Sequence, residues 1–470
     1  MKKSKFLCRF AAADKCKKAG FTIIEALIVL FIFSLITVAF YQAFSLGARY
    51  ILESKYRLGA ISVANERMEI IRSLDYSQIG ISGSGYIGGD IPDSEQITVA
   101  GRTFYVFNSV AYIDDSHDGT EGGTVDDTVP TDYKRATVKV AWENDANSDR
   151  AVSLASDFAP PGVESSAGGG TLVIKVFDKD SNGISGFNVH LANSGLGISE
   201  NYTTDSNGGI SLPGIPADGN DYEISVSKSN YFGIDTLPPY PTTSFHPAYV
   251  NASVTEGERN IYSITTDLTS DIDLITETLL GEAVSGVEYN LEGGIKKGDT
   301  LDDPPVAIFY FDEDLDSGSE GKNEINDIGY GAYTITVSDP GTDYEFVKMH
   351  PYDAALNDKT KFSVDPGADI EEKALFANKN TNSFLATITD SSNSLPIKNA
   401  SIKLYNLSLP TPYDATLNSD DFGLVYFPES LPELAAGTYD LEIQASGYQT
   451  KNDTVIVDKL TKSDISLDPQ

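Results

Sequence analysis

The sequence predicts an α+β architecture: one long N-terminal helix with an antiparallel sheet, followed by tandem all-β sandwiches. Three observations indicate this. An uncharged apolar run extends over 23 residues from Ala26 to Ala48, short alternating runs follow residue 76, and a strand-rich pattern recurs three times after residue 170. The composition agrees, because 40 Gly, 21 Pro, 25 Tyr and 22 Phe favour turns and strands over long helical arrays.

The overall charge and the cysteine count exclude several classes of protein. The chain has 34 Lys+Arg against 69 Asp+Glu, a net charge of −35, which disfavours binding to nucleic-acid phosphates. Its two cysteines, Cys8 and Cys16, both precede the apolar run, so no disulfide framework and no cysteine-based metal site is expected. The four histidines are scattered and no nucleophile motif occurs, so we expect no enzyme.

The N-terminal segment has the charge pattern of an exported chain. Residues 1–20 hold seven basic residues and one acidic residue, Asp14. The apolar run that follows would span roughly 35 Å as a helix, enough to cross a bilayer, with the basic segment on the cytoplasmic side. A membrane anchor and a signal peptide are the first interpretations. Against both, no small-x-small cleavage site follows the run, and Glu25 lies near its start, where a carboxylate needs a partner.

The string KKAGFTIIEALIVLFIFSLI resembles the leader and mature start of a type IV prepilin. The resemblance implies that residues 1–20 are a leader, that prepilin peptidase cuts between Gly20 and Phe21, and that Phe21 becomes N-methylated. It also implies that Glu25 drives assembly with other pilin subunits by neutralising the amine of a neighbour. Major pilins often interrupt this helix with Gly and Pro, whereas this chain has Ser34 and Gln42 there.

The next two segments are predicted to form the two parts of a pilin fold. The helix is expected over 21–75, with a packing face made by six large residues: Ile51, Leu58, Ile61, Met68, Ile71 and Leu74. A glycine-rich loop and alternating runs over 76–158 predict an antiparallel sheet packed against the helix. A helix followed by such a sheet is the pilin head that the resemblance implies.

An acidic loop in the head is a candidate calcium site. It reads DDSHDGTEGGTVDD, and its acidic residues are Asp114, Asp115, Asp118, Glu121, Asp126 and Asp127. Carboxylate oxygens are the ligands that Ca²⁺ prefers, and the alternative is a solvated acidic loop. The segment 159–170, rich in Pro, Ser and Gly, is expected to be a linker.

Three repeats follow the linker, over 171–267, 268–377 and 378–470. They share the anchors ISGFNVHL, VSGVEYNL and IKNASIKL, each followed by a strand that begins with a tyrosine: Tyr222, Tyr333 or Tyr439. Their length and short strands predict β-sandwiches. The first and third repeats resemble the carboxypeptidase regulatory-like domain, which implies a non-catalytic Ig-like sandwich.

The second repeat contains a further acidic segment, DEDLDSGSEGKNE, with Asp312, Asp314 and Asp316. We expect either a non-helical calcium loop or a charged surface loop. Calcium is a candidate ligand, and no cofactor is expected to be required.

Together these features predict a minor type IV pilin. It would be single-pass in the cytoplasmic membrane before assembly and then part of an extracellular filament. Its expected partners are other pilin subunits, prepilin peptidase, the inner-membrane pilus assembly machinery and an unknown extracellular ligand. Two alternatives are a pseudopilin of a secretion or uptake system and a membrane-anchored surface binding protein that does not polymerise.

Overall fold

The computed structural model describes most of the chain: residues 22–117, 119–127, 130–160, 169–338 and 342–470. These residues form two compact units. The first unit holds the N-terminal helix and most of a four-stranded sheet. The second holds residues 83–87 and 112–133 together with everything that follows the linker. Each unit is described separately below.

A single helix, α1 (Ile23–Arg72), runs for 50 residues, or about 75 Å. Thr22 caps its N-terminus, where the hydroxyl accepts a hydrogen bond from the Glu25 amide at 3.3 Å. The helix continues through Ser34 and Gln42. The Ser34 hydroxyl donates to the Phe31 carbonyl at 2.7 Å, so this polar side chain is satisfied within the helix.

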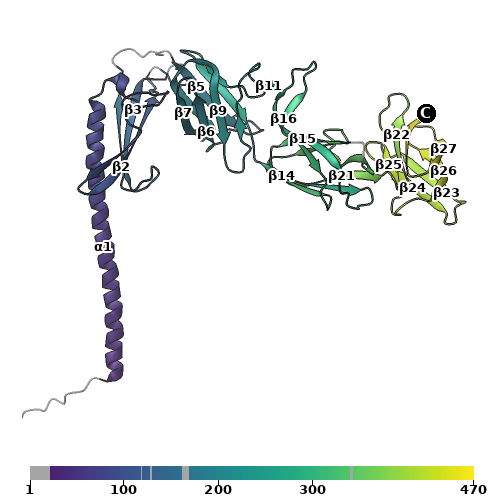
Figure 1. The fold of residues 1–470 in the computed structure, drawn as a ribbon, viewed down its shortest axis with the longest axis horizontal. Helices are drawn as coiled ribbons and strands as arrows, with labels where there is room; N and C mark the ends of the chain where they lie inside the picture. Colours follow the sequence, from purple (N-terminus) through teal and green to yellow (C-terminus); the bar gives the residue numbers. More distant parts are fainter. Residues whose placement is uncertain (1–21, 118, 128–129, 161–168, 339–341) are drawn as a thin grey trace, which may run out of the picture. The chain divides into compact units, whose positions relative to one another are not determined.

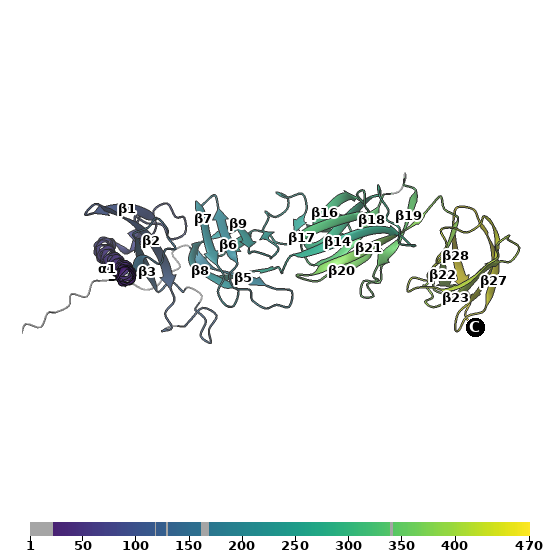
Figure 2. The ribbon, with the colours of Figure 1, turned by 90° about the horizontal axis from the view of Figure 1, so that it is seen from below.

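The first unit forms a head made of a helix and a sheet, as we predicted from the sequence. A short 3₁₀ turn, η1 (Tyr76–Gln78), follows α1. The sheet has the order β1-β2-β3-β4, and β1/β2 and β3/β4 are antiparallel pairs. It lies beside the C-terminal half of α1 (Figures 1 and 2). The strands are β1 (Ser94–Val99), β2 (Arg102–Ile113), β3 (Tyr133–Ala141) and β4 (Ala151–Phe158).

The face of α1 that packs on the sheet matches only part of the one we predicted. The helix residues buried in the head core are Ala60, Val63, Ala64, Met68 and Ile71. Met68 and Ile71 were predicted correctly. Ile51, Leu58 and Ile61 are 72%, 66% and 38% exposed, so their assignment to the packing face was wrong. Steps of seven and three residues fall about 20° and 60° short of full turns, so the predicted residues drift around the helix.

Small residues let the sheet approach α1 closely. A Cβ atom at Gly59 would lie 2.7 Å from Cζ of Phe104 on β2. Alanines at 60 and 64 continue the same face. A search for large apolar residues therefore misses the contact, because the helix contributes small side chains and the sheet contributes the large ones.

The second unit contains three pairs of sheets, each around its own apolar core. Module 1 comprises β5 (Gly169–Phe177), β6 (Asn188–Asn193), β7 (Ile198–Thr203), β8 (Gly209–Pro216), β9 (Asp218–Ser227), β10 (Ile234–Asp235), β12 (Ala252–Val254) and β13 (Arg259–Thr265). Module 2 comprises β11 (His246–Pro247), β14 (Ser270–Thr278), β15 (Glu288–Asp299), β16 (Ala307–Asp316), β17 (Lys322–Ile328), β18 (Gly331–Val337), β19 (Tyr344–His350), β20 (Lys361–Val364) and β21 (Asp369–Asn378). Module 3 comprises β22 (Ser383–Asp390), β23 (Ser401–Asn406), β24 (Tyr413–Asn418), β25 (Leu424–Phe427), β26 (Gly437–Gln444), β27 (Lys451–Val457) and β28 (Leu460–Leu467).

The modules share two structural features that explain the sequence repeat. In each, the first strand pairs in parallel with the last: β5 with β13, β14 with β21, and β22 with β28. Each repeated tyrosine is also fully buried, and its hydroxyl donates to a backbone carbonyl upstream. The acceptors of Tyr222, Tyr333 and Tyr439 are Pro216, Gly329 and Ala435, at 2.6, 2.6 and 2.9 Å. This hydrogen bond therefore holds the loop that precedes the strand in place, as the hydrogen bond of a tyrosine corner does.

Candidate functional site

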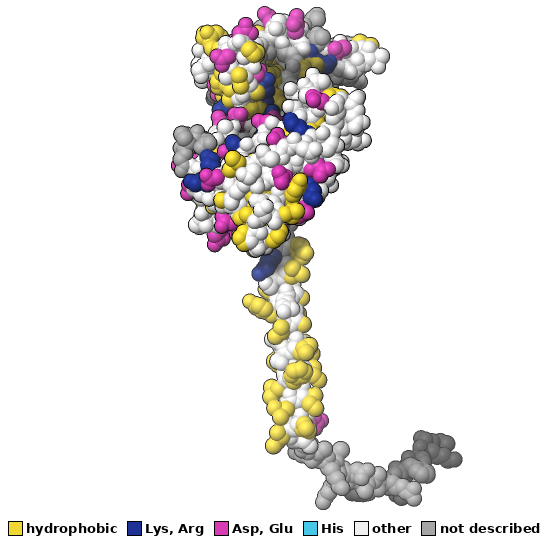
Figure 3. Space-filling view, turned by 90° about the vertical axis from the view of Figure 1, so that its right-hand side faces the viewer, with side chains coloured by type: hydrophobic (Ala, Val, Ile, Leu, Met, Phe, Trp, Pro, Cys, Tyr) yellow, Lys and Arg dark blue, Asp and Glu magenta, His cyan; other side chains and the backbone are white. Residues whose placement is uncertain are grey.

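The N-terminal candidate site lies at the start of α1. Gly20 and Phe21 lie outside the described residues. Glu25 is exposed in the first turn of the helix. The helical residues 26–44 that follow it are all exposed and, apart from Ser34, Thr37 and Gln42, mainly apolar, and Figure 3 shows apolar side chains along this stretch. The helix is long and apolar enough to cross a membrane, and its most apolar part is not buried within the structure.

Sequence reasoning missed Thr22 as part of this site. Thr22 and Glu25 occupy the N-cap and N3 positions, the spacing of a capping box. The pattern T-x-x-E ahead of an apolar run was the available signal. Glu25 therefore has two candidate roles, as a helix-capping residue and as the charge that pairs with another subunit, and the two roles require different chemistry.

The acidic loop of the head brings together three carboxylates. Oxygen atoms of Asp114, Asp127 and Asp132 lie within 4.8 Å of one another. Asp114 Oδ2 accepts a hydrogen bond from the Glu121 amide at 2.8 Å, whereas its Oδ1 is buried and accepts none. The acidic loop identified in the sequence contains Asp114 and Asp127 but not Asp132, which lies 18 residues beyond Asp114. No spacing signal marks it, because the loop itself folds Asp132 back.

The other predicted ligands of this loop are placed differently. Asp115 Oδ1 accepts from the His117 amide at 3.1 Å, and the structure does not group Asp115 with the three carboxylates. Asp118 lies outside the described residues. The loop itself packs on module 1, where Asp126 pairs with Arg259 at 3.0 Å and the Ser211 hydroxyl donates to Glu121. These two contacts therefore hold the loop that carries the carboxylates against module 1.

The three aspartates of the acidic segment of module 2 lie on a strand and not in the loop we predicted, and only residues 317–321 of the segment form a turn. Asp312, Asp314 and Asp316 all lie on β16, in register with β15. The Asn290 side chain donates to Asp312 at 2.8 Å and to Asp314 at 3.1 Å, and Asp316 accepts from the Gly318 amide at 2.7 Å. Every second residue of a strand faces the same side, so the three alternating aspartates lie on one face of β16. In the described part of the chain, the only grouping of three possible metal ligands is Asp114, Asp127 and Asp132.

Calcium binding stays a prediction, and it has a direct test at Asp132. Three clustered carboxylates repel one another, and a bound Ca²⁺ would relieve this and stabilise the folded loop. Adding Ca²⁺ to the EGTA-treated full chain in detergent is expected to raise the melting temperature of one transition. At a hundredfold excess of Ca²⁺ over Kd, the free energy of unfolding should increase by about 2.7 kcal/mol. Asp132→Asn is expected to lose the shift, whereas Asp115→Asn keeps it. An equal shift in Asp132→Asn would contradict binding at this cluster.

A family model for the prokaryotic N-terminal methylation motif matches residues 15–41. The match covers the predicted cleavage position, Glu25 and the first half of the apolar helix. It confirms the sequence-based recognition of a prepilin N-terminus. Such a motif implies processing by prepilin peptidase and assembly with other pilins, and with the single apolar helix it fits a membrane-anchored precursor.

Comparisons with curated proteins and with solved structures give less information about this chain than the motif does. No curated protein matches the chain. The solved structures include the Bacillus anthracis TIE protein, at 13% identity and a TM-score of 0.20, which covers 71% of this chain and 59% of that one. A streptococcal ancillary pilin has 12% identity and a TM-score of 0.19, covering 64% and 98%. The shaft pilin SpaA from Lactobacillus rhamnosus GG has 11% identity and a TM-score of 0.17, covering 43% and 98%.

At such TM-scores these likenesses carry no argument, and the chain spans about 59% of the length of the first of these proteins. The motif match and the geometry of α1 carry the assignment instead. This protein carries the N-terminal methylation motif of type IV prepilins on a long apolar helix, ahead of a β-sheet head and a β-rich C-terminal region.

Proposed function

We propose that this chain is a minor type IV pilin whose three sandwich modules make contacts outside the cell. The observation that carries the proposal is the division of α1 into two halves. Its first half carries the methylation motif and exposes apolar side chains on all sides, while its second half is fixed to the head sheet. A helix with this division can pass from a bilayer into the core of a filament, since both are apolar surroundings.

The size of the modules supports a minor rather than a major subunit. About 300 residues follow the linker, and a filament built mainly of this chain would have to fit them around every subunit. We place the chain at the tip of the filament or sparsely within it, where the modules serve adhesion or contact with a partner. The pilin motif suggests a structural, non-enzymatic protein. The proposed partners are other pilins, prepilin peptidase, the inner-membrane assembly machinery and an extracellular ligand.

Immunogold labelling with an antibody against module 3, together with shearing of whole cells, tests the proposal. The processed chain is expected in the sheared filament fraction, with sparse gold along or at the ends of filaments. A strain without prepilin peptidase is the control and is expected to retain the unprocessed chain in the membrane. A processed chain that stays in the membrane of normally piliated cells would exclude the pilus assignment. Secretion loss in a knockout strain would then favour a pseudopilin, and intact secretion would favour a non-polymerising anchor.

A further inference from the structure

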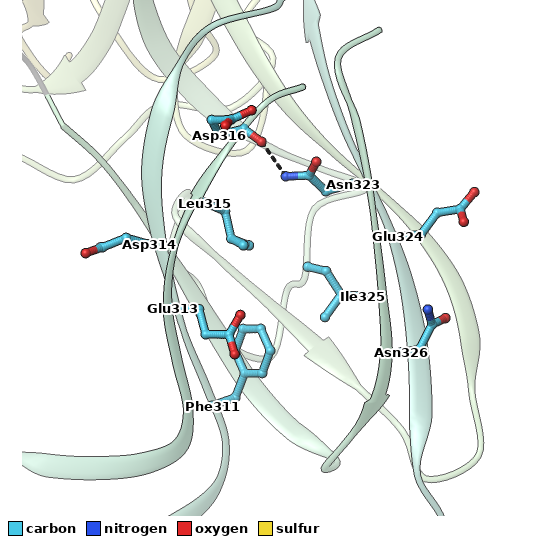
Figure 4. A pocket seen from close by; sticks show the side chains of 9 residues that line it. All are labelled: Phe311, Glu313, Asp314, Leu315, Asp316, Asn323, Glu324, Ile325 and Asn326. Atoms are coloured by element: carbon cyan, nitrogen blue, oxygen red, sulfur yellow. Dashed lines mark hydrogen bonds between the residues drawn. The ribbon is translucent and has the colours of Figure 1, made fainter. Parts of the chain in front are cut away.

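Module 2 has an open side between two edge strands. β16 pairs only with β15 in one sheet, and β17 pairs only with β14 in the other. The segment 317–321 joins them, and a cavity of about 520 Å³ lies between the two strands. Figure 4 shows side chains of both strands turned into this space. The volume is in the range of ligand sites in proteins, which is roughly 300–1,000 Å³.

The register of β16 places a carboxylate among the core-facing side chains. Glu313 stands opposite Leu291, and Leu315 stands opposite Tyr289. Leu291 and Tyr289 are buried in the core of module 2, and directly opposed residues share a face of the sheet. Glu313 therefore points toward the space between the sheets, as Figure 4 shows. The three aspartates of β16 occupy the opposite, outer face.

Glu313 is exposed at the edge of the cavity, beside three apolar side chains, and its carboxylate has no partner in the described part of the chain. Phe311 and Leu315 flank it on β16, and Ile325 faces the cavity from β17. Among the residues that the structure describes, none donates a hydrogen bond to Glu313 or forms an ion pair with it. The nearby cation, Lys322, pairs instead with Asp273 at 2.9 Å and with Glu324 at 3.1 Å.

The charge of the two strands is strongly one-sided. Residues 307–328 contain seven acidic residues and one basic residue, Lys322. An inward-pointing charge on an edge strand can also act only to prevent aggregation. That role needs a charge but no cavity, whereas here an exposed, unpartnered carboxylate borders a cavity that is lined both by apolar side chains and by further acidic side chains. This combination is complementary to a cation on an apolar stem.

We propose that the groove between β16 and β17 binds an extended peptide segment that carries a lysine or arginine side chain. The aliphatic stem lies against Phe311, Leu315 and Ile325, and the cation pairs with Glu313. The free edge of β16 offers backbone groups along which an extended segment can pair as an added strand. The inference goes beyond the proposed function, because it concerns module 2 alone and holds whether or not the chain enters a filament.

Fluorescence anisotropy with the full chain in a nonionic detergent tests the proposal. The probe is a fluorescein-labelled heptapeptide of alternating Lys and Val, and the comparison peptide has Glu in place of Lys. The Lys peptide is expected to bind saturably and the Glu peptide not to bind. Glu313→Gln keeps the shape of the side chain and is expected to weaken binding about tenfold, because it removes the charge-assisted contact.

Glu320→Gln is the matched control, because Glu320 lies in the joining segment, is exposed, carries the same charge and does not line the cavity. It is expected to change the affinity less than about twofold. Equal weakening by both variants would reduce the effect to general attraction by an acidic surface and overturn the proposal. Full competition by n-butylamine at the peptide's own concentration would assign the groove to small amines and overturn it as well. So would the absence of any binding by the Lys peptide.

Discussion

Replacing Glu25 with alanine is expected to remove the chain from sheared filaments while leaving its cleavage by prepilin peptidase intact. In an assembled filament the Glu25 carboxylate would lie in apolar surroundings beside the N-terminal amine of a neighbouring subunit. Removing one partner of a buried ion pair costs roughly 3–5 kcal/mol, because the other charge stays buried. Incorporation should therefore fall about a hundredfold or more. Quantitative immunoblots of sheared and membrane fractions measure it.

Glu25→Gln distinguishes the two candidate roles of this residue. Glutamine satisfies a capping box as well as glutamate does, and Thr22 still caps the helix. If Glu25 only completes the cap, Glu25→Gln assembles like the wild type. We expect instead that it fails like Glu25→Ala, because it carries no charge to neutralise the amine. Glu66→Ala, in the part of α1 that lies beyond the apolar run, is the control and should assemble normally. Assembly of Glu25→Gln would refute the charge-pairing mechanism.

Replacing Glu372 with glutamine is expected to stabilise module 2 at neutral and alkaline pH. Glu372 lies on β21, opposite Leu274 of β14, and is 7% exposed. Its Oε2 atom is buried without a hydrogen-bond partner. Burial, and then the nearby charge of Asp353, raise the pKa of Glu372 to about 7. The folded module therefore holds a proton that the unfolded chain releases near pH 4.5.

The sign of the pH dependence follows from this difference. Between about pH 4.5 and 7 the folded state binds more protons than the unfolded state, so the free energy of unfolding decreases as the pH rises. Above pH 7 the decrease in the free energy of unfolding is complete and amounts to about 3 kcal/mol. Glu372→Gln removes the ionisation, so it should raise stability by up to that amount at pH 8 and change little at pH 4.5.

Differential scanning calorimetry of the full chain in detergent, at pH 4.5 and pH 8, measures this effect. The transition that Glu372→Gln moves belongs to module 2, and the other transitions serve as internal references. Glu371→Gln is the matched control, because its side chain is exposed on the neighbouring position of the same strand. A shift of equal size at both pH values, or an equal shift in the Glu371 variant, would show that ionisation of Glu372 is not the cause.

Features that depend on adjacent residues could be predicted from the sequence. The prepilin motif at Gly20, Phe21 and Glu25 is one continuous string, and the family model confirms it. The helix-plus-sheet head and the β-rich repeats were predicted because apolar periodicity reports whether a segment is helix or strand. The repeated tyrosines were visible as well, although their common hydrogen bond to an upstream carbonyl was not.

Features that depend on strand register, or on residues far apart in the sequence lying close together, could be seen only in the tertiary structure. Asp132 joins Asp114 because a loop returns, and Glu313 faces the core because its strand pairs with β15 in one register. A shift by one residue would have turned Glu313 outward and its neighbouring aspartates inward. The packing face of α1 was mispredicted in part for a related reason, since small residues permit close approach but carry no strong hydrophobic signal. The sequence by itself determined how this protein begins and what kinds of element it contains; the tertiary structure decided which of its many carboxylates meet a neighbour, a cavity or solvent.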